Sequence, residues 1–209
     1  MSKDKDERKR PQLRLVVNNV EKRSGRPVAG EDDFITLDEL ILRCHEFRGH
    51  FYAGVGRLQE KAYRSLERYL ERKGWAYGLD PMHGRLMVIP AGLVCPEAIV
   101  PDSPQQDEVL VFAGEDLTGV GLCLSLEMII PFWSDDDAVM EDALLSAPIL
   151  PYGMLFLEEN RQDSYLDLIY RVALPLYPPA PTVRVLDKLF AVARTELAET
   201  LRTLADFSD

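Results

Sequence analysis

The sequence predicts an α+β fold: an antiparallel sheet of about five to six strands packed by helices, with an N-terminal helical extension. The predicted order is helix, strands, helix, hairpin, helix. Two patterns support it most directly. Even-numbered residues from Leu166 to Leu174 are large and apolar and the odd-numbered ones are mixed, which is the period of a half-buried strand. From Val183 to Leu204, apolar side chains instead recur at helical spacing.

The chain divides into a charged arm and one folded domain. Residues 1–12 contain no large apolar side chain beyond Met1, so burial cannot offset the entropy of ordering them, and we expect residues 1–33 to form a disordered basic arm. Residues 34–209 are expected to form a single α+β domain, with a helical extension at 34–56 and a core at 57–205. Residues 1–26 hold nine Lys or Arg against four Asp or Glu, a net charge of +5; because the whole chain carries −11, the other 183 residues carry −16.

These totals exclude some classes of function. A domain this acidic repels a phosphate backbone, so we expect no nucleic-acid partner. No window reaches the roughly 18 apolar residues that span a bilayer, and the N-terminus lacks the apolar core of a signal peptide, so no membrane association is expected. Cys44, Cys95 and Cys123 follow no repeated spacing, which is typical of a reducing compartment and indicates a cytoplasmic protein.

One apolar segment interrupts the basic arm. Leu13, Leu15 and Val17 alternate within LRLVV, between basic flanks. The arm is either simply mobile or carries a short recognition strand that adds to a sheet edge, in its own molecule or in a partner. In both cases, the positive charge of the arm would be attracted to the acidic domain.

Two helices are expected at the start of the domain. Thr36-Leu37-Asp38-Glu39 is a capping box, and the apolar residues after it follow at helical spacing until a break near Gly54. A second helix is expected from Arg57 to Lys73, ended by Gly74. Its predicted apolar side consists of Leu58, Ala62, Leu66, Tyr69 and Leu70, and its polar side carries Glu60, Arg64, Glu67 and Glu71.

The next segments are predicted to be strands. Trp75–Leu79 and Arg85–Ile89 are expected to pair across a turn at 80–84. Residues 90–108 contain four prolines and indicate an insertion over the surface. A short strand is expected at Val109–Phe112. The most apolar run, Val120–Ile130, is typical of a central strand.

The last third should form a helix, a hairpin and a helix. Ser134 is expected to cap a helix whose first turn is Asp135-Asp136-Asp137, because carboxylates favour the positive end of the helix dipole. The hairpin then joins Met154–Leu157 to the alternating strand through the polar segment EENRQDS. The terminal helix presents an apolar stripe of Val183, Leu186, Leu189, Phe190, Ala193, Leu197, Leu201 and Leu204.

No motif in the sequence indicates catalysis. His45 and His50 are five residues apart, which places their imidazoles about 140° apart around a straight helix and prevents them from sharing one metal. His83 is expected in a turn, and Cys95 has no basic neighbour that would activate its thiol. No glycine-rich phosphate loop follows a strand. We therefore expect no catalytic residue, metal or cofactor, and predict that the protein is not an enzyme.

The element order from Arg57 onward resembles that of the type III secretion chaperones and the related YbjN-like proteins. Glu141–Ala147 resembles the end of the middle helix of that fold, Gly153–Leu157 its fourth strand and Tyr165–Tyr170 its fifth. The N-terminal arm, the insertion at 90–108 and the strand at Val109–Phe112 are additions to the family pattern, and they favour the YbjN-like branch.

The resemblance implies a non-catalytic, chaperone- or adaptor-like protein that forms homodimers and binds an extended segment of a partner protein. Aromatic side chains and arginine often dominate interface energetics, so the candidate partner-binding residues are Trp75, Tyr77, Tyr165, Ile169 and Arg171, together with Leu13, Leu15 and Val17 of the arm.

Two alternatives remain open. The protein could be a regulatory subunit of a larger assembly, docked through its N-terminal arm. It could also be a metal- or thiol-dependent enzyme that uses Cys44, His45, His50 or Cys95.

Overall fold

The computed structural model describes residues 36–90, 93, 109–115, 122–130, 132, 134, 136–159, 165–177 and 180–208. Six strands form one antiparallel sheet in the order β1-β2-β3-β4-β6-β5. The strands are β1 (Ala76–Asp80), β2 (Arg85–Ile89), β3 (Val109–Glu115), β4 (Leu122–Ile129), β5 (Gly153–Glu159) and β6 (Leu166–Leu176). The helices are α2 (Leu37–Leu42), α3 (Cys44–Gly54), α4 (Arg57–Lys73), α5 (Asp137–Ser146) and α6 (Val183–Ser208). This arrangement confirms the predicted fold class and element order.

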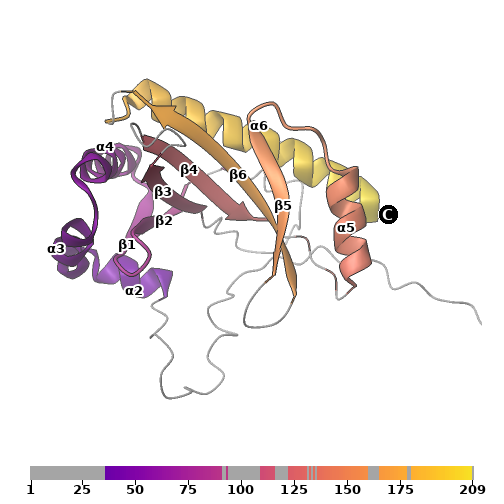
Figure 1. Ribbon diagram of the computed structural model, residues 1–209, viewed down its shortest axis with the longest axis horizontal. Helices are drawn as coiled ribbons and strands as arrows, with labels where there is room; N and C mark the ends of the chain where they lie inside the picture. The colour runs from indigo at the N-terminus through magenta and orange to yellow at the C-terminus, as the bar shows by residue number, and fades with distance from the viewer. Residues whose placement is uncertain are drawn as a thin grey trace, which may run out of the picture.

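The main core lies between one face of the sheet and helices α4, α5 and α6. Alternate residues of each strand point to this inner face, among them Leu124 and Leu126 on β4 and Tyr170 and Val172 on β6. Helix α6 runs along the sheet from the end of β6 to α5, and α4 packs beside its N-terminal part (Figure 1). Its buried stripe confirms the predicted one from Leu186 to Leu204, whereas Val183 is exposed.

The opposite, outer face of the sheet is covered at one end. Leu37 and Leu40 of α2 pack on Met87 of β2 and form a second, smaller apolar cluster. Gly78 permits this contact, because a Cβ atom there would lie 2.5 Å from the Leu40 Cβ. In Figure 1, α2 and α3 lie beside β1.

The rest of the outer face, on β4, β6 and β5, contributes no side chain to either apolar cluster of the described residues. We call it the open face because it lacks a packed apolar cluster among the described residues, although Ser125 and Ile169 on it are themselves buried. It carries Cys123, Ser125, Glu127 and Ile129 on β4, Ile169, Arg171 and Ala173 on β6, and Met154 and Phe156 on β5.

Most element boundaries confirm the sequence prediction. Thr36 caps α2, with its hydroxyl accepting from the Glu39 amide at 3.1 Å. Helix α4 has the predicted bounds and ends at Gly74, whose φ of 66° is the left-handed conformation that glycine adopts most easily. The turn between β1 and β2 and the hairpin of β5 and β6 are also where they were expected.

Other details differ from the prediction. The first helical segment breaks at Arg43 as well as at Gly54, which makes α2 and α3 two helices. Asp136, and not Ser134, caps α5; its carboxylate accepts from the Ala138 amide at 3.0 Å, while Ser134 Oγ accepts from the Asp136 amide. On α4, Leu58 is exposed and Glu67 is buried, the reverse of the predicted sides.

Several predictions concern residues outside the described ones. These are the arm at 1–33, all of the insertion at 90–108 except Pro90 and Leu93, and the hairpin loop at 160–164. Leu93 is buried in the main core. Within the described residues, no helix is both long enough and apolar enough to cross a membrane.

Candidate binding sites

Strand β5 forms one edge of the sheet, because β6 inserts between it and β4. An edge strand carries unpaired backbone N–H and C=O groups that can pair with another chain. Apolar side chains gather where the chain enters this strand: Ile149 is 99% exposed, Tyr152 60% and Met154 57%. Isolated exposed apolar residues are ordinary, but three at the start of a strand that has no second strand partner within the described ranges form a candidate docking surface.

A groove of about 480 Å³ lies between this entry segment and α6. Residues 148–152 form one wall, and Lys188, Ala191, Val192 and Thr195 of α6 contribute to the other. We call it the edge groove. The two prolines at 148 and 151 stiffen its first wall, since each fixes its own φ and restricts the residue before it. The lining is mainly apolar, and its charged side chains are Lys188, Glu196 and Glu199.

A buried carboxylate holds the start of β5 against α6. Glu196 accepts from the Tyr170 hydroxyl at 2.7 Å and from the Tyr152 amide at 2.9 Å. Burial and this bond to a carboxylate raise the pKa of Tyr170. A Cβ on Gly153 would lie 2.6 Å from Glu196 Oε2 and 2.6 Å from Tyr170 Cε2, so only glycine fits. The edge strand therefore starts from a fixed position.

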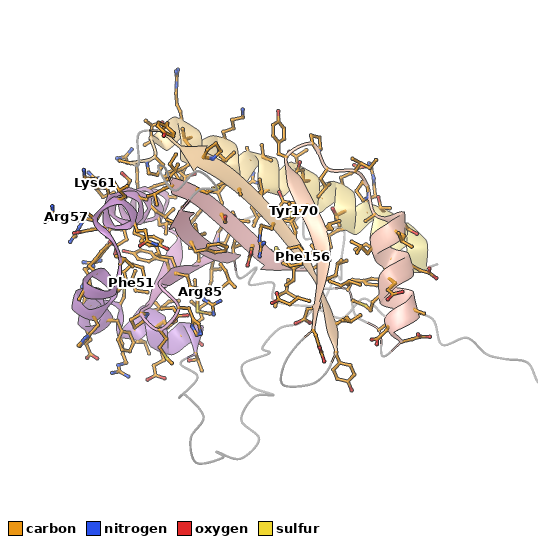
Figure 2. The ribbon with its side chains drawn as sticks, viewed as in Figure 1. Phe51, Arg57, Lys61, Arg85, Phe156 and Tyr170 are labelled. Carbon is orange, nitrogen blue, oxygen red and sulfur yellow. The ribbon has the colours of Figure 1, made fainter. Side chains whose placement is uncertain are left out.

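A second hollow, of about 520 Å³, lies where the turn between β1 and β2 meets the open face. Its polar lining includes His83, Arg85, Glu127 and Arg171, and Phe112 contributes an aromatic side chain. We call it the arginine pocket. In Figure 2, Arg85 lies on β2 on the side toward Phe51 of α3, and Phe156 lies across the sheet on β5.

Asp80 organises one side of the arginine pocket. Its Oδ2 accepts from Arg85 Nε at 3.0 Å and lies 2.8 Å from His83 Nδ1. Its Oδ1 accepts from the backbone amides of Met82 and His83, at 3.1 and 3.2 Å. This carboxylate therefore fixes the turn and orients the side chains of Arg85 and His83.

The other side is organised by the open face. Arg171 of β6 donates from its Nε to Glu127 on the neighbouring strand β4, as their cross-strand pairing allows. Its guanidinium carbon lies 4.7 Å from the centre of the Phe156 ring, a cation–π contact. Ion pair and ring together restrict the orientation of the guanidinium.

Helix α4 supports the pocket at the end of β3. The pairing of β2 with β3 stops at Val111, so the backbone of Ala113 has no partner on β2. The Tyr63 hydroxyl accepts from the Ala113 amide at 2.8 Å and donates to the Gly84 carbonyl at 2.5 Å. Gln59 donates to the Ala113 carbonyl at 2.7 Å. The side chains of Tyr63 and Gln59 thus bond the backbone groups of Ala113, which lacks a pairing partner on β2.

The sequence-predicted binding residues do not form one site. Trp75 packs edge-on against Tyr69 and Phe190, so it belongs to the main core. Tyr77 donates to Glu67 and Glu71 at 3.2 Å each. These two aromatic residues are separated from β6 by three strands, and they lie on the inner side of the sheet.

The remaining predicted residues are more dispersed still. Ile169 and Arg171 lie on the open face, where Ile169 is 7% exposed, and Tyr165 is exposed just before β6 begins. Leu13, Leu15 and Val17 lie outside the described residues. Of the predicted set, Arg171 alone lines one of the two hollows described above.

The structure also contains a buried polar network that was not predicted from the sequence. Glu67 is 5% exposed and accepts from Tyr52, from Tyr77 and from Arg48, the last at 3.0 Å. Burial and the adjacent Glu67 carboxylate raise the pKa values of Tyr52 and Tyr77. The network joins α3, α4 and β1. No pattern in the sequence indicates that Arg48 on α3 contacts Glu67 on α4.

The candidate metal and thiol residues do not converge. His45 and His50 are exposed on α3, and no three His, Cys, Asp or Glu side chains among the described residues are arranged to hold a metal ion. Burial raises the pKa of the Cys44 thiol, which lowers its thiolate fraction and hence its reactivity. Cys95 lies outside the described residues.

Comparison with known proteins finds similarity among solved structures but none in sequence. No protein-family model matches the chain, and a search of curated proteins finds no significant match. Among solved structures, the chain is similar to YbjN from E. coli, described as a candidate transcription regulator. The sequences are 10% identical, the match covers 70% of this chain and 93% of YbjN, and the TM-score is 0.42.

Proposed function

We propose that this protein is a non-catalytic binding module that takes up an extended segment of a partner protein along β5 and the edge groove. The observation that carries the proposal is the exposure of Ile149, Tyr152 and Met154 at and just before the start of β5, a strand that has a partner on one side only among the described residues. A segment added to that edge would gain backbone hydrogen bonds, and alternate side chains could enter an adjacent groove.

The energetics favour an apolar anchor in the partner segment. Complete burial of a side chain such as Ile149 contributes about 1.5–3 kcal/mol, because it is almost wholly in water before binding. Glu196 already anchors the first residues of β5 on α6, so little of the receiving backbone has to be ordered on binding.

The charge of the surface favours a basic partner segment. Glu158 and Glu159 are exposed at the end of β5, and Glu199 lies at the edge groove. Outside its first 26 residues the chain carries −16, which would attract a positively charged segment and repel an acidic one. We propose an apolar segment with Lys or Arg at its flanks.

Peptide selection tests the proposal directly. A random peptide library is selected on the full-length protein, and binding of the selected peptides is measured by fluorescence anisotropy. We expect alternating apolar residues with basic flanks, and affinity at least tenfold weaker for Ile149→Asp, since the new carboxylate cannot be buried without cost. Leu42→Asp is the matched control, because Leu42 is 82% exposed on α2, outside the edge groove.

Two outcomes would contradict the proposal. One is that no peptide is enriched on the wild-type protein over the Ile149→Asp variant. The other is that Ile149→Asp and Leu42→Asp weaken binding equally, which would place the site elsewhere.

As part of the same proposal, the protein is a chaperone- or adaptor-like homodimer of the cytoplasm. Light scattering of the full-length chain tests the dimer. Deleting residues 1–33 tests the alternative in which the arm docks the protein on a larger assembly: that alternative requires loss of assembly with an unchanged melting temperature.

A further inference from the structure

The arginine pocket presents two guanidinium groups that are each held by one nitrogen. Arg85 is bonded through Nε to Asp80 and Arg171 through Nε to Glu127. Neither arginine has a hydrogen bond from its terminal nitrogens to any described residue. Guanidinium is planar and its donors are arranged as a fork, so fixing Nε also fixes the direction of the remaining donors.

The two side chains are only partly open to solvent. Arg85 is 31% exposed and Arg171 39%, while Asp80 and Glu127 are 10% and 14% exposed. The carboxylates are therefore the more buried members of each pair, and the two arginine side chains keep part of their surface in solvent. Both arginines line the same hollow, whose size lies within the range of small-molecule sites.

The charge balance limits the kind of ligand. Two carboxylates offset the two arginines, so the pocket has no large excess of positive charge. A highly charged ligand would also be repelled by the acidic domain. Recognition must then depend on directed hydrogen bonds to one anionic group, and Phe112 and Val55 offer apolar surface for the rest of the ligand.

We propose that the arginine pocket binds a small organic carboxylate. Its carboxylate accepts hydrogen bonds from terminal nitrogens of the arginines that line the pocket, and its apolar part packs against Phe112. Planar carboxylate matches the guanidinium fork, which a lysine ammonium cannot reproduce. This site is separate from the edge groove and does not depend on the function proposed for it.

The first test uses 4-phenylbutyrate as the probe on the full-length protein. Arginine Nε–H signals and the Gly84 amide are followed by ¹⁵N NMR while the probe is titrated to about 10 mM, since a ligand of this size binds in roughly the millimolar range. We expect saturable shifts at Arg85, Arg171 and Gly84. The uncharged 4-phenylbutyramide should bind at least tenfold more weakly, because charge-assisted hydrogen bonds are the stronger ones. Phenylphosphate, titrated in parallel, shows whether the pocket instead prefers a phosphate.

Lysine substitutions keep the charge and remove the fork. Arg85→Lys and Arg171→Lys should each weaken 4-phenylbutyrate binding about tenfold or more. Arg64→Lys is the matched control: Arg64 also donates from Nε to a carboxylate, Glu60 at 2.8 Å, and lies 4.2 Å from the centre of an aromatic ring, Tyr52, but it does not line the pocket. Circular dichroism and the melting temperature verify that each variant is folded.

The proposal is overturned if no saturable shift occurs by 10 mM, if the amide binds as well as the carboxylate, or if Arg64→Lys weakens binding as much as the pocket variants. Tighter binding of phenylphosphate would overturn the carboxylate assignment. Ile149→Asp should leave 4-phenylbutyrate binding unchanged, so this proposal and the peptide-binding proposal can fail independently.

Discussion

The hydroxyl of Tyr170 donates to the buried carboxylate of Glu196 at 2.7 Å, and this bond ties strand β6 to helix α6. The same carboxylate accepts from the Tyr152 amide one residue before β5 begins. A single side chain of α6 therefore positions both strands of the hairpin, including the strand that forms the edge of the sheet.

Gly153→Ala should destabilise the protein. The added Cβ would lie 2.6 Å from both Glu196 Oε2 and Tyr170 Cε2, so the hairpin or α6 must shift. Overpacking of this kind costs about 1–3 kcal/mol, which equilibrium urea unfolding can measure. Gly114→Ala on β3 is the control, because nothing lies within 4 Å of its Cβ position. Equal losses in both variants would show that the close packing at Gly153 is unimportant.

Alkaline pH should destabilise the protein through its buried tyrosines. Burial, and then the bond to Glu196, raise the pKa of Tyr170 above its ordinary value of 10.0. The unfolded chain releases this proton near pH 10 while the folded chain retains it. The stabilisation is therefore complete below about pH 10 and declines above it, by up to about 1.4 kcal/mol per pH unit for each such tyrosine.

Tyr170→Phe tests that assignment. The variant lacks the ionising hydroxyl, so its free energy of unfolding should fall less steeply between pH 10 and pH 11 than that of the wild-type protein. Tyr52, whose pKa is also raised by burial and by Glu67, should give the same result on substitution by Phe. Parallel pH profiles for variant and wild type would refute the assignment.

Glu67→Gln should lower the free energy of unfolding substantially, although it removes only one charge from helix α4. Glu67 accepts hydrogen bonds from Arg48, Tyr52 and Tyr77 while 5% exposed, and its removal leaves the Arg48 charge poorly compensated. Breaking a buried pair typically costs about 3–5 kcal/mol, and the 34% exposure of Arg48 should reduce this to about 2–3 kcal/mol.

Glu71→Gln provides the comparison for Glu67→Gln. Its side chain is 57% exposed and lies 3.9 Å from the same Arg48 Nη2. Exposed pairs contribute about 0–1 kcal/mol, so urea unfolding should show a small change. A result in which both substitutions cost the same would mean that Glu67 is not the centre of the network.

Tyr63→Phe should destabilise the end of β3. The substitution removes the acceptor of the buried Ala113 amide and the donor to the Gly84 carbonyl, and a buried unsatisfied group costs about 1–3 kcal/mol. Tyr69→Phe is the control, since its hydroxyl donates to Asp187, whose side chain is 46% exposed and can turn to water. Amide hydrogen exchange at Ala113 should accelerate in Tyr63→Phe alone.

The sequence could predict the features of the fold that depend on neighbouring residues. Helix α4 ends at Lys73 because Gly74 adopts a left-handed conformation, and the alternation in β6 follows from its two faces. Both signals lie within a few residues of the structure they specify. The errors at Ser134 and Asp136 show that a run of capping residues leaves the first turn ambiguous by two positions.

The binding surfaces could not be predicted in the same way, because they depend on strand order. Trp75 and Tyr77 were candidates as aromatic residues of a strand, but α4 and α6 cover that face of β1. Ile149 lies between two prolines and shows no periodicity, so its exposure beside a sheet edge follows only from the position of β5. Arg85 and Arg171 are far apart in sequence, and only tertiary structure brings them to one pocket.

The strand order also constrains how the chain can fold during synthesis. Strand β4 is made before β5, yet its sheet neighbour is β6, the last strand of the chain. Until residues 166–176 have been made, the apolar strand β4 lacks one of its neighbours and β5 has no strand to pair with. A nascent chain that pauses before β6 would expose a hydrophobic strand edge, which is prone to aggregation. Release of the completed β6 is therefore the step that closes this half of the sheet.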